Sequence, residues 1–280
     1  MMRSKLFVPA TRPELFAKAE ASAADSLSFD LEDAVAESRK DEARDVLAAY
    51  LQSRQPNDKI VVVRINAVTT PWFGRDIEAI GELADIINLP MADSAGDVLQ
   101  LVELLESEAA AHTQILVNIE TPVALRRAAE LAAAHKRVTG LQIGYADLLE
   151  PYGIDRRDEG ALGHIRMTVR LAAAEAGVAA YDGAFAGVSD GDYFAQECLS
   201  ARRQGFAGKS CIHPSQIATA NQVFMPTEKE AAQARKILAA AADAEAKGLG
   251  AFLVDGQMID KPFLARARAI VASLDGAKAP

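Results

Sequence analysis

Short apolar runs alternate with longer amphipathic stretches from residue 4 to about residue 225. Runs of about four to eight apolar or β-branched residues indicate strands, and apolar residues recurring every three or four positions indicate helices. Some of these runs, such as IVVVR at residues 60–64, are continuously apolar, which is typical of parallel strands buried on both faces. The predicted strands are Ser4–Pro9, Ser26–Leu31, Ile60–Ile65, Ile86–Leu89, Ile115–Ile119, Gly140–Ile143, Val178–Tyr181 and Lys209–Ile212.

Helical patterns fill the intervals between these strands. Pro13 occupies a first-turn position in the first of them. The other predicted helices are Arg39–Leu51, Ala95–Ala111, Pro122–Ala134, Gly163–Ala176 and Tyr193–Gln204. Strands that alternate with helices fit either a doubly wound open sheet or a closed barrel. No G-x-G-x-x-G motif follows the first strand and the units are evenly spaced, so we predict a (β/α)₈ TIM barrel.

The last part of the chain lies outside the eight repeating units. We predict a barrel domain over residues 1–225 and a C-terminal helix and lid segment over residues 226–280. A helix rich in Ala, Lys and Glu is expected from Pro226 to about Lys247, followed by GLGAFLVDGQMID and a last helix opening at Pro262. We expect this segment to cover the barrel mouth or to contact a neighbouring subunit.

The composition narrows the classes of function. The 280 residues are 50% hydrophobic and 25% charged, as in an ordinary globular protein, and the net charge of −9 argues against non-specific nucleic-acid binding. No apolar run is long enough to span a bilayer, and the N-terminal residues resemble no secretory leader, so we expect a cytoplasmic protein without membrane partners. Cys198 and Cys211 fit buried, reduced thiols.

Ionisable residues follow most of the predicted strands at their carboxyl ends. In a TIM barrel these ends form the catalytic face. The residues concerned are Asp30, Glu32, Asp33, Arg64, Asn66, Glu120, Thr121, Asp147, Asp182 and His213. Any single one could be a solvated surface charge. Glu120 and Asp147, however, are one βα unit apart and should be neighbours on the rim, with Arg64 across from them.

Two adjacent carboxylates repel each other unless they share a proton or a cation. Since no cysteine or histidine cluster lies nearby, Glu120 and Asp147 predict an all-oxygen site for Mg²⁺ or Mn²⁺. The alternative is a single carboxyl group with a raised pKa that acts as an acid. Arg64 suits an anionic substrate oxygen, or alternatively an ion pair with Glu32 or Asp33.

His213 precedes Pro214, which favours an extended backbone and a fixed turn after the last strand. A catalytic histidine is the alternative interpretation at this position.

Seven motifs in order resemble the citrate lyase β-subunit group of the HpcH/HpaI aldolase family, which includes malyl-CoA and citramalyl-CoA lyases. They are RSKLFVPATRPELFAKA (3–19), FDLEDAV (29–35), VRIN (63–66), NIETPVA (118–124), GYADL (144–148), GFAGKSCIHPSQI (205–217) and FLVDGQMID (252–260). The resemblance covers nearly the whole chain. It implies a (β/α)₈ barrel assembled as a homotrimer or hexamer.

The resemblance also implies roles for individual residues. Glu120 and Asp147 would hold Mg²⁺, Arg64 would bind the keto-acid part of the substrate, and backbone N–H groups at Gly144, Ala146 and Asp147 would bind its carboxylate. Asp260 of the MID motif matches an acid/base residue supplied by a neighbouring subunit; capping the helix that begins near Pro262 is its alternative role. Arg12 and Lys18 are candidates to meet the phosphates of coenzyme A (CoA), although Lys18 also fits an ordinary exposed helix face.

Together these features predict a Mg²⁺-dependent carbon–carbon lyase. The reaction is a reversible aldol or Claisen cleavage of a short hydroxy-dicarboxyl acyl-CoA to an acyl-CoA and a 2-oxo acid. The alternatives are a citrate lyase β subunit acting on a carrier-bound citryl group within a larger complex, an aldolase acting on free hydroxy-diacids, and a non-catalytic barrel that binds CoA esters or keto acids.

Overall fold

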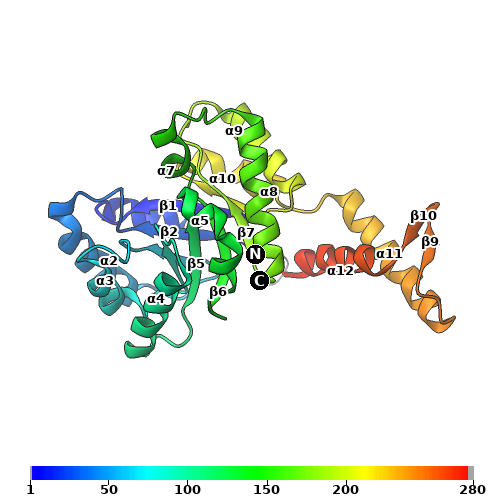
Figure 1. Ribbon diagram of the computed structural model, residues 1–280, viewed down its shortest axis with the longest axis horizontal. Helices are drawn as coiled ribbons and strands as arrows, with labels where there is room; N and C mark the ends of the chain where they lie inside the picture. Colours follow the sequence, from blue (N-terminus) through cyan, green and yellow to red (C-terminus); the bar gives the residue numbers. More distant parts are fainter. Residues whose placement is uncertain (1, 277–280) are drawn as a thin grey trace. The chain divides into compact units, whose positions relative to one another are not determined.

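The computed structural model describes residues 2–276, which form two compact units, Met2–Gln222 and a C-terminal unit beginning at Val223. In the first unit eight parallel strands pair in chain order, and β1 pairs with β8 to close a barrel (Figure 1). The predicted (β/α)₈ fold is thereby confirmed. The strands are β1 Ser4–Pro9, β2 Ser26–Asp30, β3 Ile60–Arg64, β4 Ile86–Leu89, β5 Gln114–Ile119, β6 Val138–Ile143, β7 Ala179–Asp182 and β8 Gly208–Cys211.

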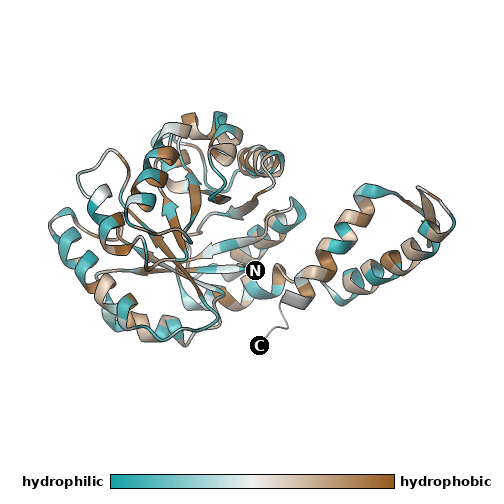
Figure 2. Cartoon of the chain, turned by 90° about the horizontal axis from the view of Figure 1, so that it is seen from below, coloured by the Kyte–Doolittle hydropathy of each residue, from teal (hydrophilic) through white to brown (hydrophobic). Residues whose placement is uncertain are grey.

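Helices surround the barrel and show their apolar faces to the strands. Figure 2 shows the brown, hydrophobic strands enclosed by helices whose outer faces are largely teal. The helices of this unit are α1 Phe16–Glu20, α2 Lys40–Ser53, α3 Phe73–Ile80, α4 Ala95–Ser107, α5 Pro122–Arg126, α6 Ala128–Ala133, α7 Tyr145–Leu149, α8 Glu159–Glu175, α9 Gly191–Arg203 and α10 Ile217–Val223. Short 3₁₀ turns lie at Pro13–Leu15, Glu37–Arg39, Glu150–Tyr152 and Pro214–Gln216.

Side-chain caps define several helix starts. Ser94 and Asp97 form a reciprocal capping box at the start of α4, and Asp158 and Asp190 cap α8 and α9. The prediction of a single helix over Pro122–Ala134 is wrong. The helix is interrupted at Arg127, giving α5 and α6.

The lumen of the barrel is filled in layers. At the amino ends of the strands it is closed by apolar side chains, including Met2, Val62 and Leu116. A polar layer lies above these, and the charged residues of the mouth lie above the polar layer. This order places most of the lumen's charged groups at the carboxyl ends of the strands, where TIM barrels carry their active sites.

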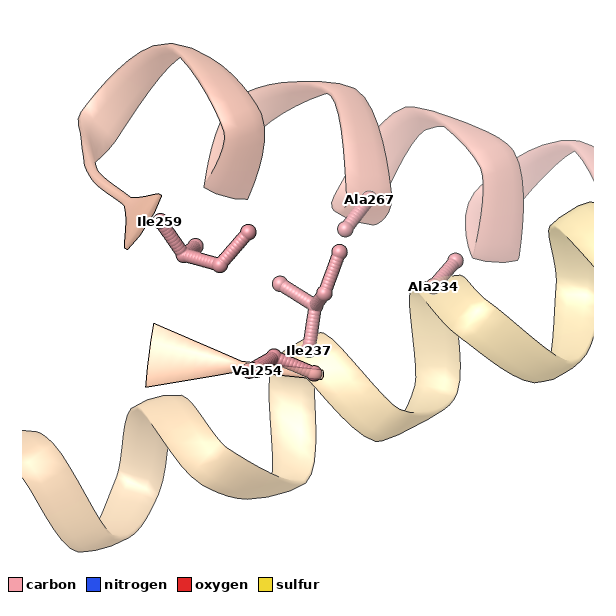
Figure 3. Close-up of a cluster of buried hydrophobic side chains, with 5 residues drawn as sticks. All are labelled: Ala234, Ile237, Val254, Ile259 and Ala267. Carbon is pink, nitrogen blue, oxygen red and sulfur yellow. The ribbon is translucent and has the colours of Figure 1, made fainter. Parts of the chain in front are cut away.

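The C-terminal unit is a helical hairpin with a small antiparallel β-ribbon. It comprises α11 Glu228–Ala246, β9 Phe252–Val254, β10 Gln257–Ile259 and α12 Lys261–Gly276. Figure 3 shows its core, where side chains from all four elements converge: Ala234, Ile237, Val254, Ile259 and Ala267. None of the helices within residues 2–276 combines the length and the apolar sequence needed to cross a lipid bilayer.

Candidate active site

Arg64 is held at the barrel mouth by three carboxylates. It is the register partner of Asp30 across β2 and β3, and its Nε and Nη2 donate to the two Asp30 oxygens at 2.8 and 2.6 Å. Nη1 lies 2.7 Å from Glu32 Oε2 and 3.1 Å from Asp33 Oδ2. The ion pairs considered as the alternative role of Arg64 are therefore present, and Asp30 adds a bidentate pair that fixes the plane of the guanidinium.

The pKa values of Asp30 and Glu32 are shifted in opposite directions. Burial raises the pKa of Asp30, but Arg64 and the backbone N–H groups of Glu32 and Ala34 outweigh it, so the pKa lies below its ordinary value. Burial raises the pKa of Glu32 to about 9 despite the nearby Arg64. Asp30 is therefore ionised beside Arg64, whereas burial disfavours the charged form of Glu32.

Glu120 follows β5 directly and is almost completely buried, with 2% of its surface exposed. Its Oε1 accepts from the backbone N–H of Met91 at 2.7 Å, and its Oε2 accepts from Asn118 Nδ2 at 3.0 Å. Met91 has a φ of 52°, a strained backbone conformation for a non-glycine residue. Burial, together with the charge of Asp147, raises the pKa of Glu120 to about 7.

Gly144 lets the turn after β6 pass directly over Glu120. Its N–H donates to Ile119 O at 3.0 Å, and a Cβ at this position would lie 2.5 Å from Glu120 Cβ. Only glycine allows so close an approach. Asp147 follows in the first turn of α7, and its side chain reaches the surface. Partial desolvation of its carboxyl group and the charge of Asp33 raise its pKa.

The donor set fits a hard divalent cation. Glu120 and Asp147 present carboxylate oxygens of raised pKa, and both oxygens of Glu120 are oriented by one N–H donor each. Mg²⁺ is commonly held by one or two carboxylates, with water and substrate at its other positions. Across residues 2–276, no group of three or more His, Cys, Asp or Glu side chains is arranged to hold a metal.

Tyr145 anchors the segment that carries Asp147. Its hydroxyl donates to Asp182 Oδ1 at 2.6 Å, and the guanidinium of Arg156 lies 4.1 Å from the centre of its ring. Asp182 itself is fully buried and accepts from Lys209 Nζ at 2.6 Å. Although Asp182 ends β7, it therefore belongs to a buried ion cluster and not to the open mouth.

Among the described residues, the other predicted side chains make no ion pair or hydrogen bond with Arg64, Glu120 or Asp147. Arg12 is exposed and pairs with Glu14, and Lys18 is exposed on α1. His213 is exposed and extended, and its Nδ1 accepts from the Ser215 N–H at 3.2 Å, as expected of a fixed turn.

Asp260 lies in the C-terminal unit, between β10 and α12, where it borders a depression with Lys261 and Arg268. Its Oδ1 is buried and has no hydrogen-bond partner among the described residues, so this oxygen does not cap α12. A buried carboxylate oxygen without a partner is unusual in a folded protein.

Sequence reasoning missed the residues that orient the site. Asn118 and Tyr145 stand within the NIETPVA and GYADL segments, but only the folded structure shows that they contact Glu120 and Asp182. Asp30 was recognised as a strand-end charge, whereas its bidentate pair with Arg64 was not foreseen. The alternation of inward and outward side chains along β2 and β3 was the available signal, since it places both residues in the lumen.

The family model described as HpcH/HpaI aldolase/citrate lyase matches residues 3–214. The citrate lyase subunit beta of Escherichia coli strain K12 is 36% identical over 278 residues, covering 96% of this chain and 92% of that protein. A (3S)-malyl-CoA thioesterase of Cereibacter sphaeroides is 34% identical over 275 residues, covering 98% of this chain and 94% of that protein.

One solved structure matches nearly the full length of the chain. The protein CitE from Mycobacterium tuberculosis, in complex with magnesium, acetoacetate and coenzyme A, superposes with a TM-score of 0.78 at 35% identity. The match covers 97% of each chain, so it extends over both the barrel and the C-terminal segment.

Proposed function

The chain belongs to the HpcH/HpaI aldolase/citrate lyase family, and from this premise we propose that it is a Mg²⁺-dependent carbon–carbon lyase acting on a short hydroxy-dicarboxyl acyl-CoA. The observation that carries the proposal is the pairing of two carboxylates of raised pKa, Glu120 and Asp147, beside a fixed arginine at the barrel mouth. A substrate of the malyl-, methylmalyl- or citramalyl-CoA type is cleaved to an acyl-CoA and a 2-oxo acid.

Glu120 and Asp147 hold the Mg²⁺ ion, which when bound supplies Lewis-acid stabilisation of the substrate oxygens. Backbone N–H groups at Gly144, Ala146 and Asp147 bind the substrate carboxylate. Because burial raises the pKa of Glu120 to about 7, Mg²⁺ binding near neutral pH would release a proton from this carboxyl group.

Arg64 faces the oxygen whose charge changes during the reaction. The hydroxyl of the substrate loses its proton, the bond between the hydroxyl carbon and the α-carbon of the thioester breaks, and the electron pair moves to the α-carbon. The alkoxide thereby becomes the keto group of the 2-oxo acid, and the thioester enolate takes up a proton. A guanidinium held by the bidentate Asp30 pair stabilises the developing charge without rearrangement.

Asp260 supplies the acid/base group from a neighbouring subunit of a homotrimer or hexamer. Its buried, unpaired oxygen and the exposed apolar side chains of the adjoining ribbon, Leu253 and Met258, support a role at an interface. Arg12 and Lys18, both exposed at the first βα unit, meet the CoA phosphates.

Two relatives supply alternative activities. A citrate lyase β subunit would act on a citryl group carried by a partner protein, and a malyl-CoA thioesterase would hydrolyse the thioester. The lyase, the carrier-dependent enzyme and the thioesterase release different products, so they are separable in one assay.

The test is incubation of the purified chain and Mg²⁺ with malyl-, β-methylmalyl-, citramalyl- and citryl-CoA and, in parallel, with a citryl carrier protein. We expect equal amounts of 2-oxo acid and acyl-CoA and no free thiol, with no release by the Glu120→Gln variant. Free CoA thiol without 2-oxo acid would assign a thioesterase. Turnover of a citryl carrier protein alone would assign the citrate lyase subunit.

A further inference from the structure

A fully buried lysine lies in the barrel lumen below the candidate metal site. Lys5, on β1, is 2% exposed, and its Nζ donates to Ser28 Oγ at 3.3 Å and to Asn88 Oδ1 at 3.1 Å. The Nζ also lies 4.2 Å from the centre of the Phe7 ring. Buried lysines are rare unless they are paired with a carboxylate, and Lys5 has no carboxylate partner among the described residues.

Lys5 belongs to a polar layer where TIM barrels normally carry Val, Ile and Leu. The layer consists of buried side chains from six strands: Lys5, Ser28, Asn88, Asn118, Gln142 and Ser210. An apolar core would be cheaper to bury, since each polar group must find a partner. A polar layer kept directly beneath the charged mouth therefore calls for a functional explanation.

Hydrogen bonds run without interruption from this lysine to the candidate metal ligand. Asn88 accepts from Lys5 through Oδ1 and donates through Nδ2 to Asn118 Oδ1 at 2.7 Å. Asn118 in turn donates through Nδ2 to Glu120 Oε2 at 3.0 Å. A donor thus begins this chain and a carboxylate acceptor ends it, so both amides point their N–H groups towards Glu120.

The direction of these hydrogen bonds does not depend on the charge of Lys5. Burial holds the pKa of Lys5 well below its ordinary value, and the nearby Arg64 lowers it further. Asn88 Nδ2 is already used by Leu116 O at 3.1 Å and by Asn118, so only Asn88 Oδ1 faces Lys5. The amine donates to that oxygen in either protonation state.

We propose that Lys5 is a positioning residue of the lyase site, which orients the Glu120 carboxylate for metal binding through Asn88 and Asn118. Without Lys5, the buried Oδ1 of Asn88 has no donor, and the amide turns to find one. Asn118 then loses its partner on the Asn88 side and is held only through Gln142, which donates to the same Oδ1 at 3.1 Å. The orientation of Glu120 Oε2 is correspondingly loosened.

This inference rests on the proposed metal site, and its test is Mn²⁺ binding measured by titration calorimetry alongside thermal unfolding. Lys5→Met keeps the length of the side chain and removes the donor. We expect it to weaken Mn²⁺ binding about tenfold. Ser28→Ala is the matched control, because Ser28 contacts Lys5 but lies outside the path to Glu120; we expect its affinity to stay within about twofold of the original.

The double variant Lys5→Met with Asn88→Leu separates positioning from packing. Replacing both partners by apolar groups of similar shape removes the unsatisfied oxygen and restores the unfolding temperature. Positioning predicts that Mn²⁺ binding stays weakened about tenfold. Recovery of affinity together with stability, or unchanged affinity in Lys5→Met, would overturn the inference, and the double variant decides the matter if Lys5→Met does not fold.

Failure of the metal site itself gives a different result. If the original chain and Glu120→Gln both show no Mn²⁺ binding, the proposed function is wrong. If the original chain binds Mn²⁺ and the Lys5 variants bind it equally well, only the role of Lys5 is wrong.

Discussion

Glu120 is the residue at which burial and charge oppose each other most directly. The side chain is 2% exposed, and its pKa is raised from 4.5 to about 7. Between these values the folded chain keeps a proton that the unfolded chain has lost. Its contribution to stability is therefore fully present below pH 4.5 and is lost as the pH rises through about 7.

Replacing Glu120 with Gln should remove this pH dependence. In metal-free buffer, we expect the stability difference between Glu120→Gln and the original chain to shift in favour of the variant from pH 5 to pH 8, by roughly 1–3 kcal/mol. Urea unfolding in the presence of a chelator measures it. Glu103→Gln, at an exposed position of α4, is the control; a difference for Glu120→Gln that does not change with pH would contradict the pKa assignment.

Arg64 allows a second prediction at this scale. Lysine would keep the charge but could not form the bidentate pair with Asp30 or present a planar group to the substrate. We expect Arg64→Lys to lower kcat/KM at least ~10²-fold, equivalent to ~3 kcal/mol of transition-state stabilisation. Steady-state kinetics with saturating Mg²⁺ would detect this, and a loss below threefold would show that Arg64 is only structural.

The residues of the mouth were predictable because the carboxyl ends of all parallel strands lie at the same end of a barrel. A charged residue that directly follows a strand therefore lies at that end. This rule located Glu120, Arg64 and Asp147. It could not locate Lys5, because a lysine within the apolar run of β1 gives no sign of direction until the register with β2 and β8 is known. The sequence pattern likewise gave Asp182 a place in the mouth, whereas Lys209 holds it in the wall.

Among the elements, α7 both contributes to the stability of the barrel and positions a residue of the candidate site. It has five residues and was not predicted, since so short a segment shows no helical period. Its position depends on Gly144, which passes over Glu120, and on Tyr145, which is hydrogen-bonded to Asp182.

Tyr145→Phe should loosen this element. Loss of the bond to Asp182 leaves the carboxylate with Arg166 and Lys209, so we expect the free energy of unfolding to fall by ~1–2 kcal/mol. We also expect weaker Mg²⁺ binding, because Asp147 follows two residues later. Calorimetric titration tests this against Tyr152→Phe, an exposed control, and equal Mg²⁺ affinity in the two variants would contradict a role for Tyr145 in placing Asp147.

Most longer elements were predicted with small errors at their ends, because their apolar period is strong. The helix α3 was missed although it buries Phe73 and Ile77, since its eight residues follow directly on a turn. The ribbon β9–β10 was also missed. The Asp255–Gly256 pair, with φ of 52° and 79°, is a hairpin signal that the surrounding glycines obscured.

At the scale of the whole molecule, the even spacing of eight units sufficed to predict a closed barrel. The assembly could not be predicted in this way, since contacts between subunits depend on surfaces rather than on periodicity. The ribbon exposes Leu253 and Met258 by 71% and 64%, and the long charged helices beside it carry few large apolar groups outward.

Complementation between inactive variants tests the shared site. Asp260→Asn and Glu120→Gln should each be inactive alone. If Asp260 acts on a neighbouring subunit, subunits mixed after mild dissociation and reassembly should form about one quarter of intact sites and recover about that share of activity. Unmixed oligomers combined at the same concentration are the control, and no recovery in exchanged oligomers would place Asp260 in its own subunit's site or outside catalysis.

The central claim is that Glu120 and Asp147 bind a divalent cation at the barrel mouth. Anomalous diffraction at the manganese edge, from crystals soaked with Mn²⁺ and a 2-oxo acid, tests it most directly. We expect one strong peak within coordination distance of a carboxylate oxygen of each residue, with the 2-oxo acid completing the shell beside Arg64. The absence of a peak at these two residues would contradict the claim, provided that protein redissolved from the same crystals turns over substrate with Mn²⁺.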